Sequence, residues 1–402
     1  MINTIVAVGL LPSNGYITGA ALSFWETLRS LESSGGFKFH PIHSAFFTVK
    51  FPNIYPSHCA FFLGPILRFL DIIYLFILTP FRLITSRCLF LCLSTNTCAS
   101  LLKDVPLIFL AKFVFCRYVV LVLHSGKTPV PANPFLGVIY RMALQQADYI
   151  VTISSGFRSL FDFIDNQEKV VTISNCPPSS TYDNIQPIHS LSDISNPQIL
   201  YLSNLISSKG YLHLIESILY LNYVLGFRCT LNICGFFVDS AIPADMNILS
   251  KVCPTALSAC TCLQDLKLVY NKVDPLKRIN FIGPVTHNAK QAYLESADLF
   301  CLPTYYDIEG LPLSALEAMA NGLPLITTKW RSLGDLVNID GLQNGLLLEN
   351  RDPRVLATSI LEILSNPTDY TVISRNSRHL YLRYFSHSSH VSAYIDLFNS
   401  LS

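Results

Sequence analysis

Short runs of branched apolar residues alternate with helix-length segments from the start of the chain. Thr4 to Val8 is such a run, a loop from Gly9 to Gly19 follows it, and Ala20 to Leu31 has the pattern of a helix. Continuous apolar runs of this length are typical of parallel strands that are buried on both faces. Further runs of this kind are Leu89 to Leu93, Tyr118 to Leu123 and Tyr149 to Ile153. The alternation predicts an α/β fold with a parallel, doubly wound sheet.

The alternation is interrupted and then starts again. Residues Cys176 to Pro197 are rich in proline, serine and asparagine and have no apolar period, which is typical of a linker between domains. Strand-like runs resume at Ile199 to Leu202, Thr230 to Cys234, Ile279 to Ile282, Leu299 to Leu302 and Pro324 to Thr327. A chain of 402 residues can form two domains with separate cores. We therefore expect domains over residues 1–180 and 195–370 and helices over residues 371–402, whereas no pattern assigns residues 252–275.

Charge and cysteine content exclude several classes of protein. The net charge is +1 and 14% of the residues are charged, so the chain has no basic field for nucleic-acid phosphates. The twelve cysteines form no secreted-type framework, and Cys260-Thr261-Cys262 is too tight for ordinary zinc spacing. Scattered thiols in a large α/β chain are typical of a reducing cytosol, so we expect a cytoplasmic protein.

Residues Phe61 to Leu78 form an apolar run that reaches the length of about 18 residues expected of a membrane span. Arg68 and Asp71 lie in its middle, where a charge costs about 2.5–3.5 kcal/mol in a bilayer. Their spacing of three residues allows them to pair on one helix face. We interpret the run as a helix that lies against other protein or on a membrane surface, with a true span as the alternative.

Two glutamates flank a predicted helix start in the second half of the chain. Glu309-Gly310-Leu311-Pro312 follows a strand-like run, and a helical pattern extends from Leu313 to Asn321. Proline suits the first turn of a helix, and the amides of Leu313, Ser314 and Ala315 would then point out of the helix start. Such amides bind anions, and Glu309 and Glu317 can flank whatever they hold. A diphosphate on the amides and hydroxyls on the carboxylates would fit a sugar nucleotide, whereas a solvated turn before an ordinary helix is the alternative.

A lysine stands at a second predicted helix start. Ser208, a candidate N-cap, and Lys209-Gly210 join a strand to the helix Tyr211 to Leu221. A cation at a helix N-terminus is unfavourable unless an anion is also bound there, so Lys209 is a candidate diphosphate ligand. A solvated surface lysine is the alternative. No Asp-x-Asp motif is present, so the sequence predicts no metal clamp and no other cofactor.

The stretch from Glu309 to Pro324 closely resembles the signature of family 4 of the retaining, nucleotide-sugar-dependent glycosyltransferases, which are GT-B enzymes of glycosyl transferases group 1. This resemblance implies two Rossmann-like domains that face across a cleft, and C-terminal helices, here within residues 371–402, that cross back to the first domain. In the family, an Arg and a Lys-Gly after a strand grip the donor diphosphate. Lys209-Gly210 match that pattern, but Asn204 occupies the arginine position and can donate a hydrogen bond without neutralising charge.

The resemblance implies further site residues. Glu317 would bind the donor ribose, whereas Glu309 and the amides of Gly310, Leu311, Leu313 and Ser314 would hold sugar and phosphate. His124, after a strand, would lie beside the transferred sugar, and the loop Gly15 to Ala21, including Gly19, resembles the family's glycine loop. Backbone at Gly283 would meet the nucleobase. Ser154 and Ser155 would cap the next helix or touch phosphate, with capping as the first interpretation.

We expect a metal-independent hexosyltransferase. Its donor would be a nucleotide sugar, specifically a UDP-sugar, and its acceptor would be a glycan or a sugar linked to polyprenyl or another lipid. The apolar first domain and residues 61–78 predict peripheral attachment to the inner face of a membrane. Two alternatives stay open. One is a catalytically silent sugar-nucleotide-binding or membrane scaffold protein, which Asn204 favours, and the other is a nucleotide-sugar 2-epimerase. The sequence does not identify the sugar, the acceptor, the linkage or the oligomeric state.

Overall fold

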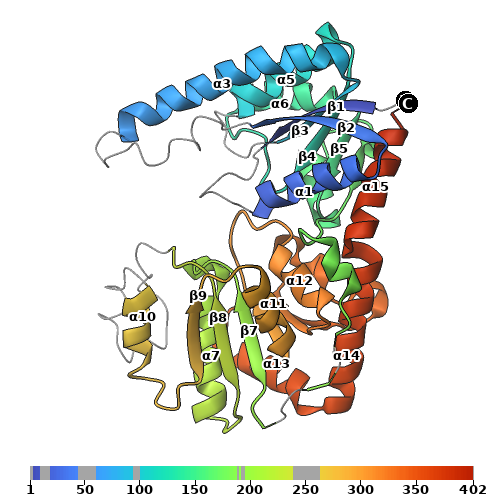
Figure 1. The fold of residues 1–402 in the computed structure, drawn as a ribbon. Coiled ribbons are helices and arrows are strands. Elements are labelled where there is room, and N and C mark those ends of the chain that lie inside the picture. Colours follow the sequence, from blue (N-terminus) through green and yellow to red (C-terminus); the bar gives the residue numbers. More distant parts are fainter. Residues whose placement is uncertain are drawn as a thin grey trace. The chain divides into compact units, whose positions relative to one another are not determined.

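The computed structural model describes residues 3–9, 19–43, 60–93, 100–187, 190–191, 195–238 and 263–401. The chain forms two compact units. The first comprises Met1–Ser179, Ile308–Leu311 and His387–Ser402, and the second comprises Ser180–Asp307 and Pro312–Ser386. Each unit contains a six-stranded parallel sheet that is flanked by helices (Figure 1). The predicted α/β fold class with parallel, doubly wound sheets is therefore confirmed.

The sheet of the first unit has the strand order β2-β1-β3-β4-β5-β6. Its strands are β1 (Asn3–Gly9), β2 (Phe37–His43), β3 (Cys88–Cys92), β4 (Tyr118–Leu123), β5 (Tyr149–Thr152) and β6 (Val170–Thr172). Every neighbouring pair is parallel. The order reverses at β1, because β2 and β3 lie on opposite sides of it. The carboxyl ends of the strands beside such a reversal are where doubly wound folds bind ligands.

Two layers of helices cover the faces of this sheet. Side chains of α3 (Ala60–Thr85), α5 (Val105–Phe109) and α6 (Pro134–Gln145) pack on one face, with the π-helical turns η1 (Ser100–Asp104) and η2 (Leu110–Val114) beside α5. On the other face lie α1 (Gly19–Ser33) and α15 (His387–Asn399) (Figure 1). Alternate residues of one strand enter the two cores: Val6 faces the α3 side and Ile5 the α15 side. This division follows from the alternation of side chains along a strand.

The sheet of the second unit has the order β12-β11-β10-β7-β8-β9. Its strands are β7 (Gln198–Leu202), β8 (Thr230–Cys234), β9 (Ile279–Gly283), β10 (Leu299–Leu302), β11 (Leu325–Thr328) and β12 (Gly345–Leu348). Its helices are α7 (Tyr211–Tyr223), α10 (Leu263–Tyr270), α11 (His287–Ser296), α12 (Leu313–Ala320), α13 (Pro353–Ser365) and α14 (Pro367–Leu380), and the π-helical turn η9 (Tyr381–Phe385) continues α14. The order reverses between β7 and β10, which pair directly.

All the predicted strands are present within one residue of their expected ends, but three strands were not predicted. In β2, Pro41 and alternating polar residues interrupt the apolar pattern, and β6 has only three residues. The third, β12, begins at the glycine of the Asn344-Gly345 turn signal, and its burial is incomplete. In the stretch without a predicted pattern, α10 (Leu263–Tyr270) is helical, and residues 252–262 lie outside the described residues.

The apolar run Phe61 to Leu78 lies within α3. Asp71, Leu75 and Leu83 are buried, so this helix packs one face on the sheet. The side chain of Arg68 lies outside the described residues, and its pairing with Asp71 stays a prediction. Within the described ranges, no helix is both long and apolar enough to cross a membrane.

Candidate functional site

The carboxyl ends of β7 and β10 in the second unit carry the loops that lead to the two predicted anion-binding residues. The β7 loop leads to Lys209 and α7, and the β10 loop leads toward α12. The backbone N–H of Tyr305 donates to the carbonyl of Ser208 at 2.7 Å, which ties the two loops together. Because the strand order reverses between β7 and β10, the loops lie where a doubly wound sheet binds its ligand.

Lys209 ends a short 3₁₀ turn, η6 (Ser207–Lys209), and Gly210 joins this turn to α7. The predicted N-cap at Ser208 is wrong, because Gly210 occupies the position before the helix with a left-handed φ of 79°. A Cβ on Gly210 would lie 2.1 Å from the Pro303 carbonyl oxygen, so glycine is required there for space as well as for conformation. The Lys209 ammonium lies 5.1 Å from the centroid of the Tyr306 ring, an aromatic contact that positions it at the loop. Asn204, in the preceding turn, is exposed.

The start of α12 supplies fewer outward amides than predicted. Pro312 is the N-cap residue, with an extended backbone, and is not in the first helical turn. Its carbonyl accepts hydrogen bonds from the amides of Ala315 at 3.1 Å and Leu316 at 3.4 Å. Leu313 and Ser314 are therefore the first two helical residues, whose amides have no partner one turn earlier in the helix. They lie at the helix end that carries a partial charge of about +0.5.

Glu317 is buried on the second turn of α12, with 4% of its surface exposed. The Lys290 ammonium on α11 contacts its carboxylate at 2.5 Å, and the Tyr182 hydroxyl also donates to it. Burial raises the pKa of Glu317 above its ordinary value, whereas the charge of Lys290 and these hydrogen bonds oppose that rise. The solvated-carboxylate alternative is wrong for Glu317.

Neither partner of Glu317 was predicted from the sequence. Lys290 is 27 residues before it, and Tyr182 is in η5 (Ser180–Asn184), a 3₁₀ turn within the stretch predicted to be a linker. No local pattern connects residues so far apart in sequence. Their contacts with the Glu317 carboxylate are therefore evident only from the three-dimensional structure.

In the first unit, the segment from Glu309 to Leu311 packs against the turn that follows β4. A Cβ on Gly126 would lie 2.2 Å from the Glu309 carbonyl oxygen, and a Cβ on Gly310 would lie 2.6 Å from that of His124. Both positions therefore need glycine so that the two backbones can approach. Glu309 is 6% exposed, so the solvated alternative is wrong for this glutamate as well.

His124 follows β4 with both ring nitrogens buried. Burial lowers its pKa to about 4, and the side chain of Asn175 opposes that shift. Neither ring nitrogen makes a well-aligned hydrogen bond to a described residue. The Asn175 amide also donates to the Leu311 carbonyl at 3.3 Å, so it contacts the Glu309–Leu311 segment as well as the histidine. With a pKa of about 4 the imidazole is neutral at pH 7, and its partner Asn175 was not predicted from the sequence.

The remaining predicted residues lie at other points of the two sheets. Gly283 ends β9 with a left-handed φ of 90°, and β8 separates it from β7. Gly19 is the first residue of α1, and residues 15–18 of the predicted glycine loop lie outside the described residues. Ser154 directly precedes the 3₁₀ helix η3 (Ser155–Phe161), but its side chain makes no capping hydrogen bond, so the capping interpretation is wrong.

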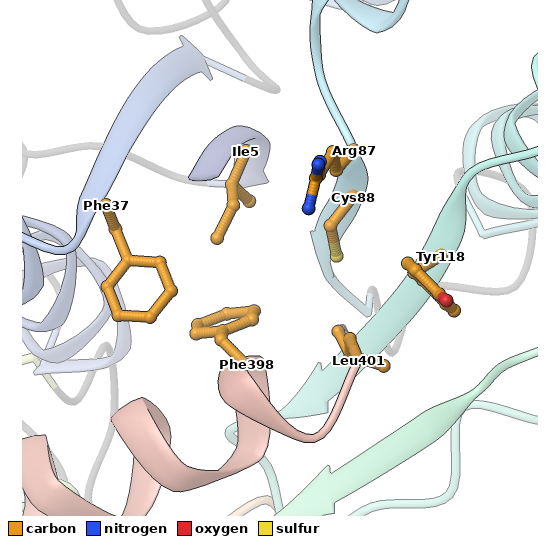
Figure 2. Close-up of a pocket in the computed structure, with 7 residues that line it drawn as sticks. All are labelled: Ile5, Phe37, Arg87, Cys88, Tyr118, Phe398 and Leu401. Carbon is orange, nitrogen blue, oxygen red and sulfur yellow. The ribbon is translucent and has the colours of Figure 1, made fainter. Parts of the chain in front are cut away.

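A small apolar pocket lies in the first unit near the amino ends of the sheet strands, opposite to their carboxyl ends (Figure 2). Phe398 and Leu401, from the C-terminal end of the chain, line it together with residues of β1, β2, β3 and β4. Doubly wound sheets bind ligands at the carboxyl edge, so we assign this pocket to the packing of α15. Among the side chains that the structure describes, no cluster of His, Cys, Asp and Glu could hold a metal ion.

Residues 186–380 match the protein family described as Glycosyl transferases group 1. An uncharacterized glycosyltransferase of Haemophilus influenzae is 26% identical over 239 residues, which span 59% of this chain and 57% of that protein. The putative colanic acid biosynthesis glycosyltransferase WcaL of Escherichia coli is 35% identical over 88 residues, 21% of each chain. The match thus spans little more than half the length of the first relative and about a fifth of the second.

Solved structures share the fold across the whole chain. The crystal structure of Anabaena HepE in complex with UDP has a TM-score of 0.68 at 15% identity and covers 99% of this chain and 100% of its own. The same protein has been solved with UDP-glucose. HepE has two Rossmann-like domains in the arrangement called GT-B, and so do other solved glycosyltransferases that resemble this chain to a similar degree. Residues 186–380 are therefore similar to Glycosyl transferases group 1, in a chain that has the GT-B fold.

Proposed function

We propose that this protein is a retaining glycosyltransferase that moves a hexose from a UDP-sugar to a glycan or lipid-linked acceptor. The observation that carries the proposal is the pairing of β7 and β10 at the strand reversal, with Lys209 and the α12 start on the loops that follow them. A lysine beside an open helix N-terminus offers positive potential for a diphosphate. Both lie within the domain that matches Glycosyl transferases group 1.

The diphosphate of the donor is held by Lys209 and by the amides of Leu313 and Ser314 in this proposal. Negative charge develops on the leaving nucleoside diphosphate during transfer, and preorganised donors stabilise it without reorganisation. These groups take the place of a metal clamp. Asn204 adds a hydrogen bond and no charge, so Lys209 is the principal counter-charge.

Glu317 binds the ribose hydroxyls of the donor. Its carboxylate is held by Lys290 and Tyr182, which fix the direction of the remaining lone pairs. The Lys290 charge also favours the ionised form, which is the form that accepts hydrogen bonds from hydroxyls. Lys290 is thus a positioning residue for donor binding in this proposal, and Gly283 contributes backbone to the nucleobase.

His124 and Glu309 act on the transferred sugar. The low pKa of His124 leaves the imidazole neutral near pH 7, so it can form a hydrogen bond to a sugar hydroxyl without acting as a cation. The amides of Gly310 and Leu311, beside Glu309, also contact the sugar or its phosphate in this proposal, and Gly19 contributes backbone from the start of α1.

A UDP-sugar donor is supported by HepE, whose structures contain UDP or UDP-glucose. A glycan or lipid-linked acceptor is supported by the name of WcaL, which refers to colanic acid biosynthesis. We place the reaction in polysaccharide- or lipopolysaccharide-type biosynthesis at the cytoplasmic face of a membrane. The Asn204 substitution favours a second candidate, a silent sugar-nucleotide-binding scaffold.

The test is the release of nucleoside diphosphate from a panel of UDP-, GDP- and ADP-sugars by the native chain and by Lys209→Ala. We expect release from a UDP-sugar and a loss of about 2–4 kcal/mol of transition-state stabilisation in the variant. Lys272→Ala, which removes an exposed lysine beyond α10, is the matched control and keeps full activity. Full activity in Lys209→Ala would overturn the diphosphate assignment. Binding of UDP without release from any donor would favour the scaffold.

A further inference from the structure

The outer face of α3 is apolar along its described length. Five exposed side chains follow one another at helical spacing: Phe69, Ile73, Ile77, Phe81 and Ile84. Between 39% and 69% of the surface of each is exposed. The opposite face of the helix, with Leu75 and Leu83, packs on the sheet. An ordinary surface helix places polar residues on its outer face, so this helix is apolar on the side where water would otherwise lie.

The neighbouring helices continue the same surface. We call α3, η1, α5, η2 and α6 the α3–α6 layer. They share one core face of the sheet, and Figure 1 shows α3, α5 and α6 on the same side of it. Exposed apolar residues of the layer outside α3 include Leu102, Phe113, Phe135, Val138 and Met142.

Most of the exposed apolar residues of the unit lie on one side of it. The α3–α6 layer carries twelve of the fourteen exposed large apolar residues among those that the structure describes in the first unit. The described residues of α1 and α15, on the other face, carry none. Exposed apolar residues gathered on one face mark an interaction site.

The charges of the layer have one dominant sign. Two lysines of the layer are neutralised by ion pairs, Lys103 with Asp104 at 2.6 Å and Lys112 with Asp148 at 2.7 Å. The two acids of the layer, Asp71 and Asp104, are both buried. Arg82 and Arg141 are exposed beside Phe81 and Met142. Among the described residues, the layer therefore presents an apolar surface whose exposed charges outside these ion pairs are the arginines Arg82 and Arg141.

We infer that the α3–α6 layer docks flat on the surface of an anionic lipid bilayer. Aromatic and aliphatic side chains would enter the boundary between headgroups and acyl chains, and the basic side chains would contact lipid phosphates. Two copies of the chain, by contrast, would bring two basic surfaces together at the cost of repulsion. Because the inner face of α3 stays packed on its sheet, the helix would lie parallel to the membrane surface, at the boundary between lipid and water.

This inference deepens the proposed function, because the partner is the membrane that would carry a lipid-linked acceptor. Docking through the first unit would hold the enzyme at the surface where such acceptors are found. Binding to vesicles and turnover of a soluble donor are separate measurements. Either can therefore fail without the other.

The experiment is flotation of the full chain with phosphatidylcholine vesicles and with vesicles in which about a third of the lipid is phosphatidylglycerol. We expect binding to the anionic vesicles and a decrease at high salt. The variant Ile73→Ser/Ile77→Ser/Phe81→Ser should lose about a hundredfold or more in partitioning. The variant Arg82→Gln/Arg141→Gln should lose about 25-fold, because each basic residue near the surface contributes about fivefold.

The matched control is Val355→Ser/Val372→Ser/Leu382→Ser, which removes three exposed apolar side chains from the second unit. It should bind vesicles like the native chain. Native binding by the α3 triple variant, equal binding to neutral vesicles or no binding by the native chain would each overturn the inference. So would a native dimer that the α3 variant converts to a monomer, because that result assigns the surface to a second copy. Release of UDP from the soluble donor should be equal in all these proteins, and its absence throughout would count against the proposed function alone.

Discussion

At the scale of single residues, the packing of two glycines holds the Glu309–Leu311 segment against the β4 turn. The Cβ of an alanine at residue 126 would lie 2.2 Å from a backbone oxygen, far inside contact distance. We expect Gly126→Ala to destabilise the first unit by about 1–3 kcal/mol and to displace Glu309, because backbone cannot yield as a flexible side chain does. Gly36→Ala, where nothing lies within 4 Å, is the control. Urea unfolding of both variants gives the comparison, and an equal midpoint would contradict the packing argument.

Local patterns predicted some site residues and could not predict their partners. Lys209 and Glu317 were found because each stands beside a predicted helix start. The contact of Glu317 with Lys290 depends on how α11 and α12 pack, which no short-range pattern encodes. Asn175 and Leu311 are 136 residues apart, so their hydrogen bond was equally hidden. The N-cap prediction at Ser208 was wrong for a local reason: the residue before α7 is Gly210, in a left-handed conformation that serine rarely adopts.

At the scale of elements, His390 fastens α15 to the first unit. Its Nδ1 lies 2.6 Å from the Ser174 carbonyl oxygen, so it donates there, and its Nε2 lies 2.8 Å from the Thr27 hydroxyl and accepts. Burial lowers the pKa of His390 to about 4. The unfolded chain therefore binds more protons between about pH 6.5 and pH 4, and stability is lost as the pH falls through this window.

This linkage predicts a pH-dependent stability of the first unit. Lowering the pH from 7 to about 5 should cost about 2 kcal/mol for each histidine of this kind, and His124 adds a second. His390→Asn should reduce the pH dependence, whereas His379→Asn, at an exposed site on α14, should leave it unchanged. The free energy of unfolding is measured in urea at the two pH values. Hydrogen exchange in peptides of β3 and β4 reports the unfolding of the first unit. If the stability of His390→Asn fell with pH as steeply as that of the native chain, His390 would not be a source of the pH dependence.

Elements with an uninterrupted apolar pattern were predicted, and elements with weak patterns were not. The four residues Leu299–Leu302 of β10 are all buried and were predicted with their ends. In β2, by contrast, Lys38 and Pro41 interrupt the run, and pairing with β1 supplies the stability that its own sequence lacks. Tertiary context thus overrides a weak local preference.

At the scale of the whole molecule, the alternation of strands and helices predicted the fold class, whereas the return of the C-terminal helices to the first domain was implied only by the family resemblance. The same alternation is compatible with several strand orders, because each order buries the same apolar runs. The grouping of residues 308–311 and 387–402 with the first unit depends on contacts between distant segments. It follows that the first unit is completed only after the second has been synthesised.

This path makes a prediction for the loss of the C-terminal end. Tyr394, Leu397 and Phe398 are buried against Phe37, Phe39 and Phe90. Burial of each such side chain contributes about 1.5–3 kcal/mol, so deletion of residues 387–402 should cost about 5 kcal/mol or more. That loss is comparable with the whole stability of a domain. The first unit should therefore unfold at a temperature where the second stays folded, which calorimetry would record as two separate transitions. The double variant Tyr394→Ala/Phe398→Ala should shift the same transition, and a single transition at the native temperature in both proteins would show that α15 does not hold the first unit together.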